Sequence, residues 1–211
     1  MVLRGGLVCF FLVLWLLPLS AQEFVAGLSL GVGRSWEVER FPPNQFPDPN
    51  DAIIGGSGFE LGTVIGYRLD NFLISGRPTL MLQNTAAQLR PSDGMPLGSR
   101  ESIYPVAALL PLRVDYTFGE QRFRPSLGLG GGFLINVARE ELRSGLVPEP
   151  VLPYLEVSVG VEYAWSGFRI RPEIHVRNST GPIFSGGESA INERLQYHRW
   201  GYVAIGIVVT N

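Results

Sequence analysis

Lysine is absent from this sequence of 211 residues, and cysteine and histidine are scarce. All 17 basic residues are arginine, and the single cysteine, Cys9, lies close to the N-terminus. The rest of the chain contains two histidines and no cysteine, so it lacks the usual ligands of a zinc site and the thiol of a cysteine nucleophile. We therefore expect no metal site and no cofactor.

Long apolar runs are also missing, with one exception at residues 7–17, which follow an arginine. This run is short against the roughly 20 residues of a membrane-spanning helix, but it suits the apolar core of an export signal. We predict a signal peptide over residues 1–22, cleaved near Ala21 or Gln22, and a single domain over residues 23–211. A transmembrane anchor is the alternative interpretation of the run.

The predicted mature chain is weakly acidic. Without the signal, 16 arginines stand against 19 acidic residues, a net charge near −3. Nucleic-acid-binding proteins are usually basic, so we expect no nucleic acid as a partner.

Alternation with a period of two residues dominates the mature chain. In segment 168–177, for example, large apolar residues and proline alternate with arginine, glutamate and histidine. One face of each such strand would be apolar and the other small or charged. We assign eight strands on this basis, at residues 24–33, 59–68, 72–83, 103–118, 123–137, 155–165, 168–177 and 197–210.

Short and long connections alternate between these strands. The short ones are residues 69–71, 119–122 and 166–167, and the long ones are about 36–57, 85–101, 139–150 and 178–196. This rhythm is typical of an outer-membrane barrel, with tight turns and both termini in the periplasm. We predict an all-β fold, an eight-stranded antiparallel up-and-down transmembrane β-barrel with a polar, side-chain-filled lumen. A lipocalin-like soluble barrel, which binds a ligand in the periplasm, is the alternative, with its faces reversed.

Aromatic residues are concentrated beside the predicted short turns. Tyrosine and tryptophan favour the membrane interface, so a girdle is expected there. Its predicted members are Tyr67, Phe72, Tyr116, Phe118, Phe123, Tyr163, Trp165 and Phe168. At the opposite rim we place Tyr104, Trp200 and Tyr202.

The inner faces carry nearly balanced charge. If the turn lies at residues 166–167, cross-strand register pairs Glu162 with Arg171 and Glu156 with Arg177. Buried charges are tolerated when paired, so we predict a structural ion-pair network without catalytic residues. Its predicted members are Glu60, Arg68, Arg77, Arg113, Asp115, Glu156, Glu162, Arg169, Arg171, Glu173 and Arg177. Eight strands leave an interior only wide enough for side chains, so no open pore is expected.

One enzymatic alternative remains. His175, Asn178, Ser179 and Glu188 resemble the active-site residues of lipid A deacylases, which are also eight-stranded barrels. In those enzymes the nucleophilic serine follows the histidine by two residues, and here Arg177 occupies that position. Acyl hydrolysis needs a nucleophile close to its base, and none is found at that position. We therefore expect that this protein is not an enzyme.

Residues 104–119, 124–133 and 173–184 resemble the PorT-like outer-membrane β-barrel family of Bacteroidetes. The matching motifs are the proline-bearing strand that starts Tyr104-Pro105-Val106 and ends Tyr116-Thr117-Phe118-Gly119, and the Arg-Pro-Ser-Leu-Gly-Leu-Gly start at Arg124. The resemblance implies a location in the outer membrane of a Gram-negative bacterium and no particular reaction.

We therefore expect a monomeric envelope protein with a structural, adhesive or secretion-associated role, exercised through its extracellular loops. Its expected partners are outer-membrane lipid, the barrel-assembly machinery during biogenesis, and envelope or secretion-system proteins. The first long loop is a candidate contact surface because it contains Pro42, Pro43, Pro47 and Pro49 with Phe41 and Phe46.

Overall fold

Strands are the regular structure of the residues that the structure describes. The computed structural model describes residues 22–39, 51–52, 55–90, 97–138, 147–184 and 198–211, and no helix among them is long and apolar enough to cross a membrane. The predicted signal peptide lies outside the described residues, except for Gln22. The strands are β1 (Gln22–Glu39), β2 (Asp51–Ala52), β3 (Gly56–Leu69), β4 (Phe72–Gly76), β5 (Thr79–Gln83), β6 (Ala86–Arg90), β7 (Leu97–Ser102), β8 (Val106–Thr117), β9 (Phe123–Asn136), β10 (Val151–Trp165), β11 (Phe168–Ser179) and β12 (His198–Thr210).

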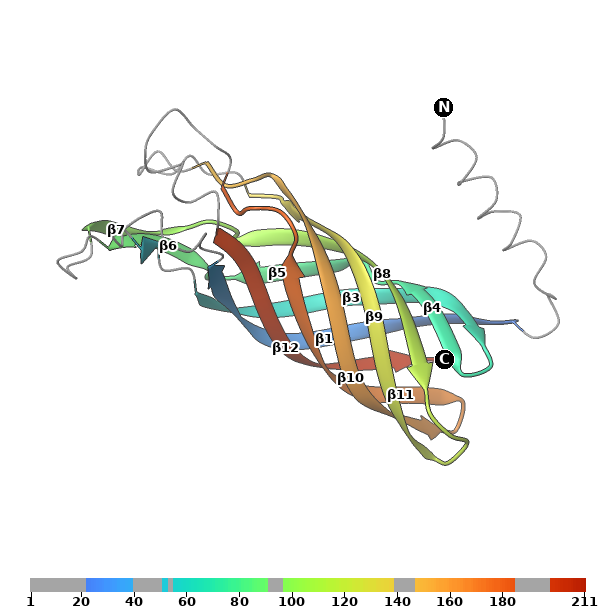
Figure 1. The fold of residues 1–211 in the computed structure, drawn as a ribbon. Coiled ribbons are helices and arrows are strands. Elements are labelled where there is room, and N and C mark those ends of the chain that lie inside the picture. The colour runs from blue at the N-terminus through green and yellow to red at the C-terminus, as the bar shows by residue number, and fades with distance from the viewer. Residues whose placement is uncertain (1–21, 40–50, 53–54, 91–96, 139–146, 185–197) are drawn as a thin grey trace, which may run out of the picture.

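The main sheet closes on itself as a barrel (Figure 1). Neighbouring strands pair antiparallel in the order β1, β3, β4 with β5, β8, β9, β10, β11, β12. The first strand closes the ring because it pairs with both β3 and β12, in the latter case from Gly27–Thr210 to Glu39–His198. Since β4 and β5 are two halves of one strand, the barrel has eight strands, as the sequence predicts.

The predicted short turns lie together at one end of the barrel, here named the turn end. Ser166 and Gly167 have φ angles of 45° and 90°, the left-handed conformations that a two-residue type I′ hairpin requires. Asp70 and Gly119 are also left-handed, at 52° and 76°. The C-terminus is drawn at this end too (Figure 1). The strand ends that lead into the long connections lie at the opposite end of the barrel, here named the loop end.

The third barrel strand is interrupted at Arg77 and Pro78 because two prolines meet there on adjacent strands. Pro78 and Pro111 supply no N–H group, so the hydrogen-bond ladder loses donors on both sides of the interruption. The Arg77 carbonyl instead accepts a hydrogen bond from the Thr79 hydroxyl at 2.8 Å. Outside this point lies a groove of about 420 Å³, lined largely by apolar residues such as Leu28, Leu61, Leu80 and Leu110.

Parts of the predicted loops are strands. The first strand continues to Glu39, and residues 85–101, predicted as a loop, contain the hairpin of β6 and β7. With β2 this hairpin forms a three-stranded sheet at the loop end (Figure 1). The residues of β2, β6 and β7 lack the apolar alternation on which the sequence prediction depended. The prolines and phenylalanines of residues 41–49 lie outside the described residues.

The exterior of the barrel is apolar and the interior is charged. Large outward residues on every barrel strand are exposed, among them Val32 at 61 % and Leu129 at 65 %. Charged residues such as Arg113, Glu156 and Arg177 are buried in the interior. This sidedness is that of a barrel surrounded by hydrocarbon and contradicts the lipocalin-like alternative.

The predicted aromatic girdle forms at the turn end. Ring contacts join neighbouring strands there, with centroids 4.8 Å apart for Phe72–Tyr116 and 4.7 Å for Phe123–Tyr163. The predicted opposite rim is wrong, because Tyr104, Trp200 and Tyr202 are fully buried inside the barrel. Their rings fill the interior at the loop end instead of facing lipid.

A charge on the lipid-facing surface tests this sidedness. We expect Leu129→Arg to lower the free energy of unfolding by about 2–4 kcal/mol, the cost of arginine near the middle of a bilayer. Denaturant titration of the barrel in lipid vesicles measures this change. The matched variant Glu120→Arg, in an exposed turn, should leave the unfolding free energy unchanged. Equal stability of the two variants would contradict a membrane-embedded surface at Leu129.

Candidate functional site

The interior has two layers. A charged layer extends from the turn end through the middle, and an apolar cluster fills the loop end. No group of three or more histidine, cysteine, aspartate or glutamate residues is placed to hold a metal ion in the part of the chain that the structure describes. The site to consider is therefore the barrel's filled interior together with its loop end.

Arg113 on β8 is the centre of the charged layer. Its Nη1 atom lies 2.7 Å from Glu156 Oε1 and 2.9 Å from Glu173 Oε1, and its Nη2 atom lies 2.6 Å from Asp115 Oδ1. Arg77 contacts two of the same carboxylates, at 2.7 Å for Asp115 and 3.0 Å for Glu173. Strands β5, β8, β10 and β11 are thus linked across the lumen, because the Arg77 segment leads directly into β5.

Arg171 belongs to this central group. Its Nε atom lies 3.2 Å from Glu173 Oε2, and its Nη2 atom lies 3.5 Å from Asp115 Oδ2. The predicted pairing of Arg171 with Glu162 is therefore wrong. Long arginine side chains reach diagonally across the lumen, so their partners differ from the residues opposite them in the β-ladder.

Glu162 is instead the centre of a second group near the turn end. It forms ion pairs with Arg68, at 2.9 Å between Nη2 and Oε2, with Arg124, and with Arg169 at 3.4 Å. Arg169 also lies 3.1 Å from Glu23, which is half exposed. Ion pairs at this end therefore become progressively more exposed to water.

Arg177 links the charged layer to the apolar cluster. It forms ion pairs with Glu60 and with Glu156, the second of these in the predicted pairing. Its guanidinium carbon also lies 5.9 Å from the ring centroid of Tyr154 and 5.8 Å from that of Tyr202. Cation–π contacts of this kind allow a buried cation to border an apolar region.

The network includes residues that the sequence analysis did not assign to it. His175 lies between two carboxylates, with Nε2 3.3 Å from Glu60 and Nδ1 3.6 Å from Glu173. Arg124 and Glu23 pair with its outer members. Alternation could have identified His175 and Arg124, because both lie on the inward face of their strands.

Small residues make room for these side chains. A Cβ atom at Gly128 would collide with Asp115, Ser158 and Arg113. A Cβ atom at Gly130 would likewise lie 2.5 Å from Cγ of Arg113, so these two glycines of β9 leave room for buried charge. The cavity enclosed by Glu60, Arg113, Glu173 and their neighbours measures only about 20 Å³, room for about one water molecule.

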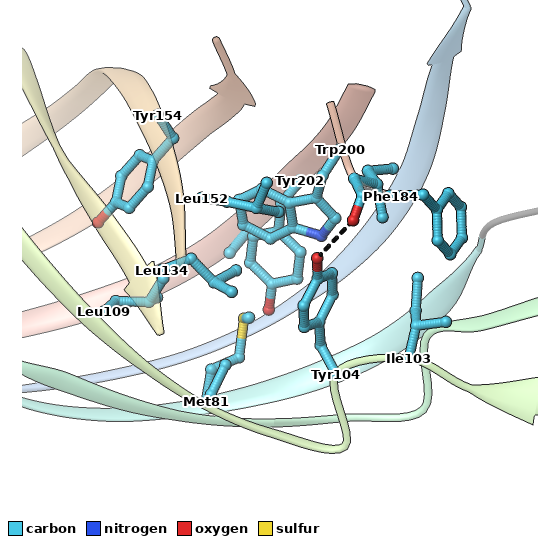
Figure 2. Packing of buried hydrophobic residues seen from close by; sticks show 13 residues of the cluster. Met81, Ile103, Tyr104, Leu109, Leu134, Leu152, Tyr154, Phe184, Trp200 and Tyr202 are labelled. Carbon is cyan, nitrogen blue, oxygen red and sulfur yellow. Dashed lines mark hydrogen bonds between the residues drawn. The ribbon is translucent and has the colours of Figure 1, made fainter. Parts of the chain in front are cut away.

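The apolar cluster closes the loop end (Figure 2). Trp200 stacks on Tyr202 with centroids 5.5 Å apart, and Ile183 and Phe184, from the segment after β11, are fully buried beside them. The Tyr104 hydroxyl donates toward the Ile183 carbonyl at 3.2 Å. The full cluster contains Met81, Ile103, Tyr104, Ala107, Leu109, Leu134, Leu152, Tyr154, Ile183, Phe184, Trp200, Tyr202 and Ala204.

Backbone hydrogen bonds hold the segment after β11 across the opening. The Ile183 amide donates to the His198 carbonyl at 3.0 Å, and the Ile183 carbonyl accepts from the Glu149 amide at 2.7 Å. The Ser179 hydroxyl accepts from the Trp200 amide at 2.9 Å and donates to the Gly181 carbonyl at 2.9 Å. This segment is therefore an integral part of the barrel's closed end.

The residues that resemble a deacylase site do not come together. His175 is buried between two carboxylates, Asn178 faces outward, and the Ser179 hydroxyl is occupied by backbone groups. Ser179 lies four residues from His175 along the strand, roughly 13 Å away at the usual rise per residue. Glu188 lies outside the described residues.

The fold and the sidedness define the class of this protein, an eight-stranded transmembrane β-barrel. The crystal structure of Neisserial surface protein A (NspA) is similar, with a TM-score of 0.51 and 12 % identity over 89 % of this chain and 99 % of that one. The attachment invasion locus protein Ail of Yersinia pestis has a TM-score of 0.33 and 14 % identity over 90 % and 99 % of the two chains. Its complex with the heparin analogue sucrose octasulfate has a TM-score of 0.34, with the same identity and coverage.

These comparisons concern architecture. The likeness to NspA, at 12 % identity, supports the fold alone. No protein-family model matches the chain, and no curated protein matches it. The resemblance to the PorT-like family therefore stays a prediction.

Removal of one buried charge tests the energetic role of the network. We expect Glu156→Gln to lower the free energy of unfolding by about 3–5 kcal/mol, because Arg113 and Arg177 would each lose a buried carboxylate. The matched variant Glu23→Gln, at the half-exposed pair with Arg169, should cost less than about 1 kcal/mol. Denaturant titration in vesicles measures both. A small, equal effect of the two substitutions would show that the buried network does not stabilise the barrel.

Proposed function

We propose that this protein is an outer-membrane barrel of a Gram-negative bacterium with a structural, adhesive or secretion-associated role. It acts through its loop end, which faces the cell exterior, and it provides no open pore. The observation that carries the proposal is the filled interior, in which ion pairs occupy the charged layer and aromatic side chains close the loop end.

The location rests on two physical features. The chain would cross the membrane with strands whose outward residues form an apolar band, an arrangement found in bacterial outer membranes. Short turns at one end and long connections at the other match periplasmic and extracellular sides. The aromatic girdle then marks the periplasmic interface, and the sheet of β2, β6 and β7 projects outside the cell.

We propose the loop end as a contact surface because the polar residues of the interior are not accessible to a partner. Residues that chemistry would need are buried and engaged with one another, so we propose no enzymatic activity. Outer-membrane lipid, the assembly machinery and envelope or secretion-system proteins are the proposed partners of a monomeric barrel. Membership of the PorT-like family of Bacteroidetes is part of this proposal and is carried by the sequence motifs alone.

The absence of a pore can be tested directly. We expect the purified barrel to give no conductance steps in planar lipid bilayers, because its side chains leave a cavity of only about 20 Å³ in the charged layer. Protease protection of the reconstituted protein verifies its insertion in the same preparation. Reproducible steps from inserted wild-type protein would overturn this part of the proposal.

The extracellular contact role requires a partner near the projecting sheet. We expect a photo-reactive residue at Gln88 in β6 or Ser99 in β7 to cross-link an envelope or secreted protein in intact cells of the native organism. The same residue at Leu129 on the lipid-facing surface is the matched control and should give no protein adduct. If all three positions give the same pattern, the projecting sheet is not the contact surface.

A further inference from the structure

The groove outside the strand interruption is a hollow in the lipid-facing surface. It measures about 420 Å³ and crosses four neighbouring strands, β1, β3, β5 and β8. Small outward side chains create it, because Thr63, Pro78 and Ala108 lie among larger leucine side chains from all four strands. The leucines that border it on the outward face are Leu28, Leu61, Leu80 and Leu110.

Two aligned rows of outward residues lead from the groove toward the loop end. The first row is apolar, since Val32 pairs with Phe59 and Phe59 pairs with Leu82, and their side chains are 44 % to 61 % exposed. Two residues further along each of the same strands, the outward residues are polar. They are Arg34, Ser57 and Asn84, the last of which directly follows β5.

The polar row is held together across the strands. Arg34 pairs directly with Ser57, so the two share the outward face. The Asn84 side-chain oxygen accepts a hydrogen bond from the Ser57 amide at 2.6 Å, which leaves its Nδ2 group as a donor. All three side chains are exposed, and no carboxylate among the described residues forms an ion pair with Arg34. The row therefore presents a guanidinium, a hydroxyl and an amide N–H to a ligand.

The polar row lies at the level of the lipid headgroups. An arginine is costly on the lipid face near the bilayer midplane and nearly free of cost near an interface. Trp36, the next outward residue after Arg34 on β1, supports this level, because tryptophan prefers the membrane–water interface.

The groove lies much deeper in the bilayer than the polar row. Ser57 is six residues from Thr63 on β3, roughly 20 Å along the strand. Because strands of membrane barrels tilt by about 35–45°, this length corresponds to about 15 Å of depth. Half of a hydrocarbon core of about 30 Å is the same distance, so the groove lies near the bilayer midplane.

The two parts together identify the ligand chemistry. Guanidinium, hydroxyl and amide N–H groups donate to phosphate oxygens, and an acyl chain that starts at headgroup level descends to the depth of the groove. We propose that this face of β1, β3 and β5 binds an outer-leaflet lipid, with its phosphate at Arg34, Ser57 and Asn84 and one acyl chain in the groove. The proposal rests on the outer-membrane orientation proposed above.

The groove explains why a lipid would stay at this face longer than elsewhere on the barrel. A lipid against a convex surface contacts protein on one side only. A chain in the groove contacts side chains from four strands and gains van der Waals contacts. A soluble anion could use the polar row alone, so the groove distinguishes a lipid from inorganic phosphate.

Native mass spectrometry of the full barrel, released from phosphatidylcholine nanodiscs, tests both parts of the site. The probes are lipid A with both phosphates, its chemically dephosphorylated form and inorganic phosphate. We expect the wild-type barrel to prefer phosphorylated lipid A. Arg34→Gln should bind that form about fivefold more weakly, because one charge near the membrane surface is lost, and should bind the dephosphorylated form unchanged. Arg34→Lys keeps the charge and should retain most of the binding.

Filling the groove tests the acyl-chain part of the site. Ala108→Phe places a ring in the hollow and should weaken the binding of both lipid A forms about tenfold, through the loss of roughly ten van der Waals contacts. Ala26→Phe, at an exposed outward position of β1 away from the groove, is the matched control and should bind like the wild type. Thr63→Leu is a second filling variant that should act in the same direction. Heat-modifiable electrophoretic mobility reports whether each variant forms the barrel.

Four results would overturn the proposal. They are equal binding of phosphorylated lipid A by Arg34→Gln and wild type, equal binding of the two lipid A forms by the wild type, groove-filling variants that bind like Ala26→Phe, and binding of inorganic phosphate as strong as that of lipid A. A wild-type barrel that inserts into vesicles but shows one of these results refutes the lipid site and leaves the proposed function standing. Failure to insert refutes both.

Discussion

Arg113 lies in the middle of the barrel, 2 % exposed, and within 3 Å of carboxylates on β8, β10 and β11. Hydrocarbon outside the wall offers no hydrogen bonds, so backbone groups must pair around a closed ring and interior charges must pair with one another. The other features of the barrel follow from this constraint. Gly128 and Gly130 on β9 provide volume for Arg113, and the Thr79 hydroxyl donates to the Arg77 carbonyl where Pro78 and Pro111 remove backbone donors.

The change from charge to aromatic packing toward the loop end explains why the interior is closed. Arg177 is the boundary, since it binds Glu60 and Glu156 on one side and faces Tyr154 and Tyr202 on the other. Beyond it, the segment that carries Ile183 completes the apolar cluster. Described side chains therefore fill the interior from the charged layer to the apolar cluster at the loop end.

Local chemistry made several features predictable. Short connections such as Ser166–Gly167 and alternation along each strand predicted the hairpins, the closed barrel and its apolar exterior, which the structure confirms. For the ion-pair network, the sequence predicted which residues belong to it better than it predicted which of them pair. Glu156 does bind Arg177 across the ladder, whereas Glu162 binds Arg68, Arg124 and Arg169. Curvature brings strands distant in sequence within reach of one another, and no ladder register describes that proximity.

The sequence by itself determined the strand number, the inside-out sidedness and the turn-end girdle, because a period of two residues and tight-turn residues act over a few neighbouring positions. Only the tertiary structure decided the other partners of the buried arginines, and that Tyr104, Trp200 and Tyr202 point inward. Those outcomes depend on the diameter and closure of the barrel, which place residues from several strands in one small volume. A side chain's neighbours across a lumen are a property of the ring and not of any single strand.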